Sequence, residues 1–239
     1  MESPLYVLLS QQDALQRQME IVAQNIANVS TTGYKSNDVL FEDFLIKPNA
    51  KTTHHMVLDR ATIRNTGQGV LQQTDNPLDL AISGQGYFAV ETPQGIQYTR
   101  QGSFQVDAEG NMVTPDGYQV LSAGSTAIAI PREAKNISIA RDGTISTESG
   151  KIGRIQTVKF SQEQLMKQTY GGFYSTDEAP KVDDISELTQ GMVESSNVKP
   201  VVEMSHVIEI SRAYERVAHL IDSENQRLTS AIRSLGKVA

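Results

Sequence analysis

The apolar positions at the start of the chain follow a helical repeat. Between residues 2 and 29 they recur at alternating spacings of three and four, and Gln12 is the one polar residue in the seam. This heptad spacing places side chains on one face of an α-helix. Gly33, a few residues beyond, supplies a stop signal. The seam consists of Leu5, Leu8, Leu15, Met19, Val22, Ile26 and Val29.

A second seam occupies the C-terminal end, with Glu224 as its polar exception. At 1.5 Å per residue, the two helices would be roughly 40 and 50 Å long, and we expect them to pair as a coiled-coil-like unit. The second seam consists of Val207, Ile210, Tyr214, Val217, Ile221, Leu228, Ala231 and Leu235.

The middle of the chain has a different pattern, with short apolar runs separated by turn residues. Fifteen of the 17 glycines lie between Gly67 and Gly191, and residues 87–91 and 96–100 flank Pro93-Gln94-Gly95 as the strands of a hairpin would. This spacing predicts an all-β domain. The expected fold is therefore mainly β with long helical termini.

This pattern also divides the chain into expected domains. We predict a discontinuous helical domain from residues 1–33 and 194–239, and a central β domain from residues 69–193. Residues 34–68 form a connector that packs beside the helices.

Composition excludes several classes of partner and of chemistry. The 239 residues carry a net charge of -7, which opposes binding to phosphate backbones, so we expect no nucleic-acid partner. The absence of Cys excludes disulfides and thiolate chemistry. No apolar stretch reaches the length of a membrane span, so no membrane insertion is expected. The N-terminus lacks the basic and apolar regions of a cleaved secretory signal.

Catalytic or metal-binding patterns are weak. His54 and His55 are adjacent, which points them to opposite sides of a strand, and His206 and His219 lie too far apart on a helix to share a metal. We therefore predict no catalytic, cofactor or metal site, and a protein that is not an enzyme. The alternative is a secreted β-domain enzyme with oligomerising helical arms, which would need converging carboxylates; Asp183-Asp184 is a pair in a polar loop.

Three ordered blocks of sequence carry a family resemblance. The first spans residues 23–35, the second residues 76–88 and 98–104, and the third residues 196–215. Together they resemble the bacterial flagellar rod and hook proteins. The matching motif residues are Asn25, Asn28, Thr31, Gly33, Tyr34, Lys35, Asn197 and Arg212.

The resemblance implies a structural component of the flagellar basal-body rod, a tubular drive shaft that transmits motor torque. The start of the chain and residues 41–44 look most like a proximal-rod member, and a distal-rod member is the alternative. The implied partners are the chain itself, other proximal and distal rod proteins and the flagellar type III export apparatus. The implied location is the periplasmic rod of the basal body, reached without a cleaved signal peptide.

Physical chemistry gives the two seams a role in such a tube. Each fully buried Leu, Ile or Val contributes about 1.5–3 kcal/mol, and two helices cover each other only in part. We therefore expect the seam residues to form the assembly interface, with neighbouring copies as the cover. Five further apolar residues off the seams are expected to supply contacts: Leu9, Ile21, Val202, Ile208 and Leu220.

Overall fold

The computed structural model describes residues 3–49, 52–122, 124, 126–131, 134, 136–183 and 185–236; at residues 3, 4, 43–49, 52–59 and 235 it describes the backbone only. The chain forms two compact units. One consists of Met1–Ala27, Ser36–Asn65 and Lys199–Ala239, and the other of Asn28–Lys35 and Thr66–Val198. The chain therefore passes between the units four times. Below they are called the helical unit and the β unit.

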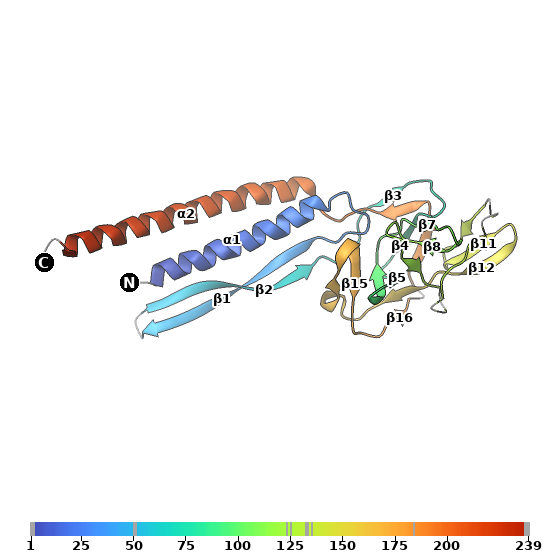
Figure 1. Ribbon diagram of the computed structural model, residues 1–239, viewed down its shortest axis with the longest axis horizontal. Helices are drawn as coiled ribbons and strands as arrows, with labels where there is room; N and C mark the ends of the chain where they lie inside the picture. The colour runs from blue at the N-terminus through green and yellow to red at the C-terminus, as the bar shows by residue number, and fades with distance from the viewer. Residues whose placement is uncertain are drawn as a thin grey trace. The chain divides into compact units, whose positions relative to one another are not determined.

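The helical unit contains two helices and one long hairpin, which lie side by side (Figure 1). Its elements are α1 (Ser3–Ala27), β1 (Asn37–Asn49), β2 (Thr52–Arg64) and α2 (Pro200–Gly236). Pro200 suits the first position of α2 because the missing N–H would have no partner there. Glu203 in the first turn and Arg233 in the last complement the helix dipole.

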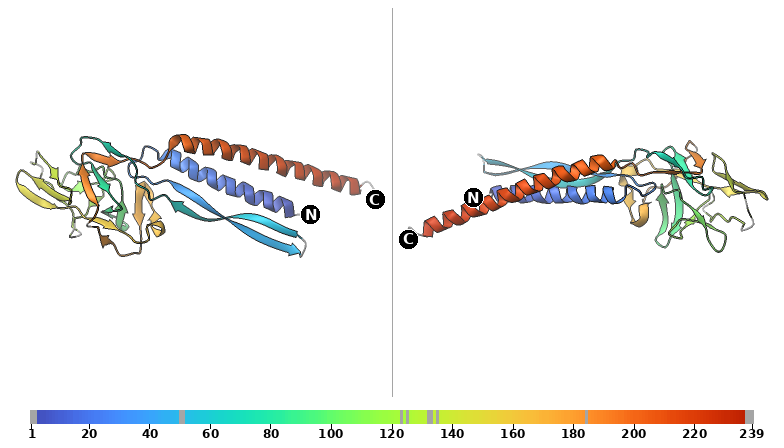
Figure 2. Two further views of the ribbon diagram at one scale, coloured as in Figure 1. Left: turned by 180° about the vertical axis from the view of Figure 1, so that it is seen from behind. Right: turned by 90° about the horizontal axis from the view of Figure 1, so that it is seen from above.

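The two helices pack antiparallel through the predicted seams (Figure 2). Val22, Ile210 and Val217 are buried. The polar exception in the first seam has a partner, because Gln12 Nε2 donates a hydrogen bond of 2.7 Å to Tyr214 Oη. The other seam residues with described side chains are half-buried, except the exposed Ala231: Leu5, Leu8, Leu15, Met19, Ile26, Val29, Val207, Tyr214, Ile221 and Leu228.

One expectation about α1 is wrong. Ile21 lies off the seam and was expected to contact neighbouring copies, but its side chain is 5% exposed. A cavity lined by Ile21, Val22, Val39 and Ile210 shows that this face of α1 lies against β1 as well as α2. The hairpin thus covers the flank that the second helix leaves open.

The hairpin occupies most of the expected connector. β1 and β2 pair antiparallel, from Asn37 opposite Arg64 to Asn49 opposite Thr52, with irregularities after Leu40 and after Ile46. The backbone of His54 and His55 lies in β2, and their side chains are outside the described residues. The sequence pattern predicted a connector over these residues and no strands.

The β unit is built from short strands, as the turn spacing predicts. A three-stranded sheet has the order β10-β11-β12, and the largest sheet follows β14-β15-β6-β5-β9-β8-β7, with β13 joining β5 to β16; β17 pairs with β4 and β18 with β3. The strands are β3 (Leu71–Gln73), β4 (Leu80–Ser83), β5 (Tyr87–Thr92), β6 (Gly95–Thr99), β7 (Gln105–Val106), β8 (Met112–Val113), β9 (Gln119–Val120), β10 (Ser138–Ile139), β11 (Thr144–Thr147), β12 (Gly150–Arg154), β13 (Thr157–Lys159), β14 (Lys167–Gln168), β15 (Phe173–Ser175), β16 (Lys181–Val182), β17 (Glu187–Gln190) and β18 (Met192–Glu194); Glu163–Leu165 and Tyr170–Gly172 are single 3₁₀ turns.

Both faces of β5 are buried, so this strand separates two apolar clusters. Phe88 and Val90 point to one face, and Tyr87 and Ala89 to the other, as the period of two requires. The first cluster contains Leu80, Ile82, Phe88, Val90, Phe104, Met112, Val120, Ile128, Ile130, Ile139, Ile145, Ile155, Phe173 and Leu188. The second contains Tyr87, Ala89, Tyr98, Leu121, Val158, Phe160, Met166 and Tyr174.

Gly102 is required where two backbones meet at the edge of the first cluster. The Leu80 N–H donates a 2.8 Å hydrogen bond to the Gly102 carbonyl. A Cβ at Gly102 would lie 1.7 Å from the Leu80 carbonyl oxygen. We therefore expect Gly102→Ala to lower the free energy of unfolding by about 2–4 kcal/mol, measured by urea denaturation.

The matched control for this prediction is Gly153→Ala, because nothing lies within 4 Å of a Cβ built there. We expect its free energy of unfolding to change by less than about 0.5 kcal/mol. Equal denaturation midpoints for the two variants would contradict the close-contact argument.

Candidate functional site

Within the β unit, the segments that lead to the four crossings are hydrogen-bonded to one another. Residues 28–35 bond to the end of β18 and the loop after it: the Gly33 N–H donates to the Glu194 carbonyl at 2.7 Å, and the Asn197 N–H to the Tyr34 carbonyl at 3.3 Å. Residues 66–70 join this group, because Asn197 Nδ2 donates to the Gly67 carbonyl at 2.9 Å. Segments distant in sequence are thereby fixed together.

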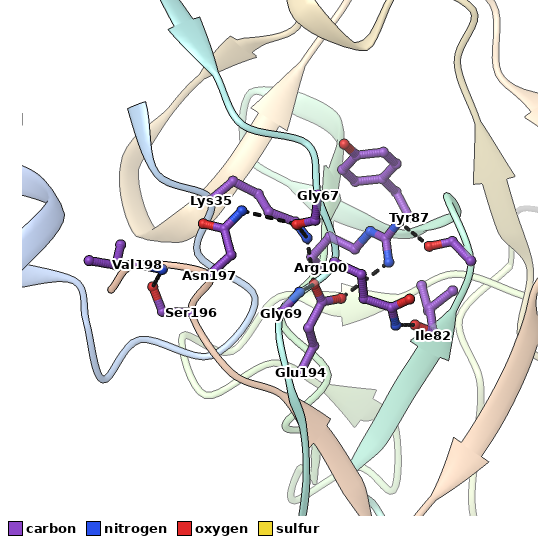
Figure 3. Close-up of polar contacts among 12 residues, drawn as sticks. Lys35, Gly67, Gly69, Ile82, Tyr87, Arg100, Glu194, Ser196, Asn197 and Val198 are labelled. Carbon is purple, nitrogen blue, oxygen red and sulfur yellow. Dashed lines mark hydrogen bonds and ion pairs between the residues drawn. The ribbon is translucent and has the colours of Figure 1, made fainter. Parts of the chain in front are cut away.

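A buried ion cluster lies among these segments (Figure 3). Lys35 Nζ is 2.5 Å from Glu194 Oε1, and Arg100 Nη1 is 3.2 Å from Glu194 Oε2. The three side chains are between 1% and 3% exposed. One carboxylate therefore bridges two cations out of contact with water. We refer to Lys35, Arg100 and Glu194 as the ion cluster.

Backbone groups and one ring surround the cluster and satisfy its charges. Lys35 Nζ also donates to the Gly67 carbonyl at 2.9 Å. The Gly69 N–H donates to Glu194 Oε1 at 2.8 Å, and Arg100 Nη2 donates to the Gly84 carbonyl at 2.6 Å. The Tyr87 ring lies 5.1 Å from the Arg100 guanidinium carbon, in cation–π range. These carbonyls and the ring compensate the excess positive charge.

Burial shifts the pKa of Lys35. Desolvation lowers the pKa of its ammonium below the ordinary value of 10.5, although Glu194 opposes this shift by attraction and by a hydrogen bond. Losing either partner would leave a charge buried without compensation, which typically costs 3–5 kcal/mol in a buried pair. The cluster therefore demands that all its parts be present together.

Gly33 allows the first segment to approach Arg100 closely. Its φ is +69°, in the left-handed region, as the sequence predicts for a residue after the helix end. A Cβ at this position would lie 2.5 Å from the Arg100 carbonyl carbon. The glycine therefore allows residues 28–35 to pack on the loop that follows β6, as well as forming the turn.

Other residues of the motif do not join the cluster. Asn25 lies in the helical unit, where its Nδ2 donates to the Asn37 carbonyl and its Oδ1 accepts from the Asn37 N–H, both at 2.9 Å. It thus fixes the start of β1 to α1. Thr31 Oγ1 donates to Asn28 Oδ1 at 3.2 Å in the turn after α1. Arg212 is exposed on α2.

Arg100 lies in the matching block of residues 98–104, but the sequence indicated no role for it. The sequence did not identify Glu194 as a functional residue. Both stand beside Lys35 in the fold, although Glu194 is 159 positions away from Lys35 in the chain. Lys35 closes a run of uncharged residues from Asn25 onward, which is a weak signal for a buried charge. No local pattern identifies which distant acid pairs with it.

The predicted assembly surface lies on the helices and is only partly covered. Val29 is the exception, since it belongs to the β unit, and the side chain of Leu235 is outside the described residues. Several large apolar side chains on α1 and α2 are 40% exposed or more: Tyr6, Leu9, Val201, Val202, Met204, Ile208, Leu220 and Ile232.

Of the carboxylate pair considered for catalysis, the structure describes Asp183. Asp184 is outside the described residues. The Asp183 carboxylate accepts from the backbone N–H groups of Ile185 and Ser186, at 3.1 and 3.3 Å. Burial raises its pKa, but these hydrogen bonds and Lys159 hold it below the ordinary value. Asp183 thus orders the loop before β17.

No group of three or more His, Asp or Glu side chains is arranged to hold a metal ion in the described part of the chain. Neither α1 nor α2, over the residues described, is long and apolar enough to cross a membrane.

The ion cluster generates a stability prediction. Glu194→Gln removes the charge that Lys35 and Arg100 share, so we expect the free energy of unfolding to fall by about 3–5 kcal/mol. Glu187→Gln is the matched control, since Glu187 pairs with Arg141 at 3.6 Å while 60% exposed. That change should cost less than about 1 kcal/mol. Chemical denaturation measures both, and similar losses would contradict the role assigned to the cluster.

Three family profiles match the chain in order. Residues 5–35 match the flagella basal body rod protein family, residues 81–147 the flagellar hook protein FlgE/F/G D1 domain, and residues 189–234 the flagellar basal body rod FlgEFG protein C-terminal region. The three matches cover both helices and the center of the β unit.

Relatives that are similar over nearly the whole chain are also flagellar basal-body rod proteins. The flagellar basal-body rod protein FlgF of Caulobacter vibrioides is 38% identical over 245 residues, covering all of both chains. FlgF of Mesorhizobium japonicum is 33% identical over 99% of both chains. FlgG of Buchnera aphidicola is 32% identical over 90% of this chain and 93% of its own. The chain therefore belongs to the flagellar basal-body rod protein family.

Proposed function

We propose that this structural rod protein occupies the proximal rod and assembles through its helical unit into the tube that transmits motor torque. The observation that carries the proposal is the apolar surface on α1 and α2 that its own chain leaves uncovered. Ile208, Leu220 and Ile232 are 53%, 55% and 70% exposed. Copies packed side by side would bury such side chains, each at a gain of about 1.5–3 kcal/mol.

The helix pair is proposed to be coiled-coil-like. The heptad spacing of both seams, the burial of Val22, Ile210 and Val217, and the hydrogen bond between Gln12 and Tyr214 support this. A single polar pair in an apolar seam favours one alignment of two helices, because any shift would separate two half-buried groups from their hydrogen-bond partner. The predicted seam residues are accordingly proposed as the rod-core interface.

The two predicted domains would have different roles in the rod. The helical domain, residues 1–33 and 194–239, would form the tube wall, and the β domain, residues 69–193, would make lateral contacts. Torque applied to one unit must reach the other through the chain crossings. Lys35, Arg100 and Glu194 fix the segments next to the crossings, so the crossings would share the load.

The proposed partners are other copies of the chain, other rod proteins and the flagellar type III export apparatus. The proposed location is the periplasmic rod, reached without a cleaved signal peptide. The absence of Cys is compatible with passage of an unfolded chain through an export channel, because no disulfide loop obstructs it. Electron microscopy that locates the subunit within the rod separates a proximal from a distal position.

Substitution of exposed apolar residues tests the assembly proposal. Ile208→Asp and Leu220→Asp place a charge on the uncovered helix surface and remove little from the interior, so we expect loss of swarming motility. The purified variants should keep their melting temperature within about 2 °C.

The matched control is Ile96→Asp, since Ile96 is 50% exposed but lies on β6 in the β unit. We expect cells with this variant to retain swarming. Normal motility in the Ile208→Asp and Leu220→Asp strains would refute assembly through this surface.

A further inference from the structure

One end of α2 projects beyond α1, and an open groove lies between the two helices. Gln12 lies opposite Tyr214 in the antiparallel pair. Counting back nine residues from Gln12 reaches Ser3, and nine onward from Tyr214 reaches Ser223. α2 therefore continues past the beginning of α1 by residues 224–236, a length of about 20 Å, and both figures show α2 continuing (Figure 1 and Figure 2). We call residues 224–236 the overhang.

The overhang continues the seam that binds α1 but has no helix opposite it. Leu228 lies on the seam, and Ile232 follows one turn later on the same face, with 70% of its surface exposed. Along the rest of α2, this face packs on α1. A helical surface similar to that of α1 would therefore cover it on the overhang. Continuity of the seam thus indicates that a helix pair of the same kind covers it.

The groove lies between α1 and α2, nearer the other end of the pair. Leu15, Met19 and Ala23 line one side of it, and Ile210 and Tyr214 the other. Its volume is about 520 Å³ and most of its lining is apolar. An aliphatic pair at the spacing of Leu228 and Ile232 matches the row of α1 residues, which also recur every four positions.

The overhang and the groove carry side chains of opposite charge. Glu215 lies at the groove and Arg233 follows Ile232 on the overhang. Over the part of the chain that is described, neither residue forms an ion pair. Glu20, also at the groove, pairs with the exposed Arg17 at 3.2 Å, so Glu215 is the acidic group left for a partner.

We propose that the overhang of one copy docks into the α1–α2 groove of the next copy, with Ile232 against Met19, Leu228 against Ala23, and Arg233 beside Glu215. The proposal rests on the assembly function above and names the surfaces that meet. Because overhang and groove are different surfaces of one chain, the contact is head-to-tail and leaves a free overhang and a free groove at each end. Repetition of it extends a filament along the helix axes.

The chain contains no Cys, so an introduced pair reports this contact alone. In the double variant Met19→Cys, Ile232→Cys, the two sites of one copy lie about 35 Å apart along the helix pair and cannot bridge within a chain. Basal bodies are isolated from cells whose only copy is the variant, oxidised mildly and separated on a non-reducing gel. We expect a ladder of dimers and higher oligomers.

Three control strains define the result. Met19→Cys alone and Ile232→Cys alone should give no cross-linked dimer. Val201→Cys with Ile232→Cys should also give none, since Val201 is 77% exposed but outside the groove. Ala23→Cys with Leu228→Cys is a second pair that should reproduce the ladder, and it decides the matter where the first pair is not incorporated.

The charge pair gives an independent measurement. In the Met19→Cys, Ile232→Cys background, Glu215→Arg or Arg233→Glu alone should lower the cross-linking yield about two- to fivefold, the effect expected of an exposed ion pair. The combined charge swap should restore the yield. Equal yields in all these strains would contradict the pairing of Glu215 with Arg233.

The outcomes separate this inference from the proposed function. Basal bodies that contain the chain but give no ladder with either cysteine pair would overturn the docking of overhang into groove and leave the rod function intact. Dimers from Ile232→Cys alone would replace it with a symmetric contact between overhangs, because one Cys per chain forms one disulfide. Absence of the wild-type chain from basal bodies would overturn the function and the inference together.

Discussion

A buried carboxylate shared by two cations is the constraint on which the organisation of the β unit depends. Glu194 accepts hydrogen bonds from Lys35, Arg100 and the Gly69 N–H, so three charged side chains and one backbone group, from four parts of the chain, meet out of water. An isolated charge in such a place would be prohibitively unfavourable, and a complete set is tolerated only when each member has its partners. The positions of residues 28–35, 66–70 and 194–198 are therefore determined jointly.

Two kinds of information in the sequence predicted the fold well. The heptad seams identified both helices, and the buried positions Val22, Ile210 and Val217 fall on them. Turn residues identified the short central strands. The long hairpin was not predicted, because Asn37–Asn49 and Thr52–Arg64 pack on α1 through tertiary contacts that no local period shows. Burial of Ile21 has the same origin.

The site was harder to predict than the fold. Family resemblance selected Lys35, Gly33 and Asn197, and the structure brings these three residues together. Resemblance alone assigned them no partners. Arg100 and Glu194 are paired by tertiary folding across long separations, which no helical or strand period encodes. Asn25 belongs to the same motif but bonds to Asn37 in the other unit, so one continuous motif serves two different packing problems.

The separation of Lys35 from Glu194 also sets the order in which the molecule can mature. Contacts between distant residues form slowly because a long loop must close first. When the chain emerges from any narrow passage with its N-terminus leading, Lys35 arrives early and must wait for Glu194, near the far end. The ion cluster therefore forms only after most of the polypeptide has emerged.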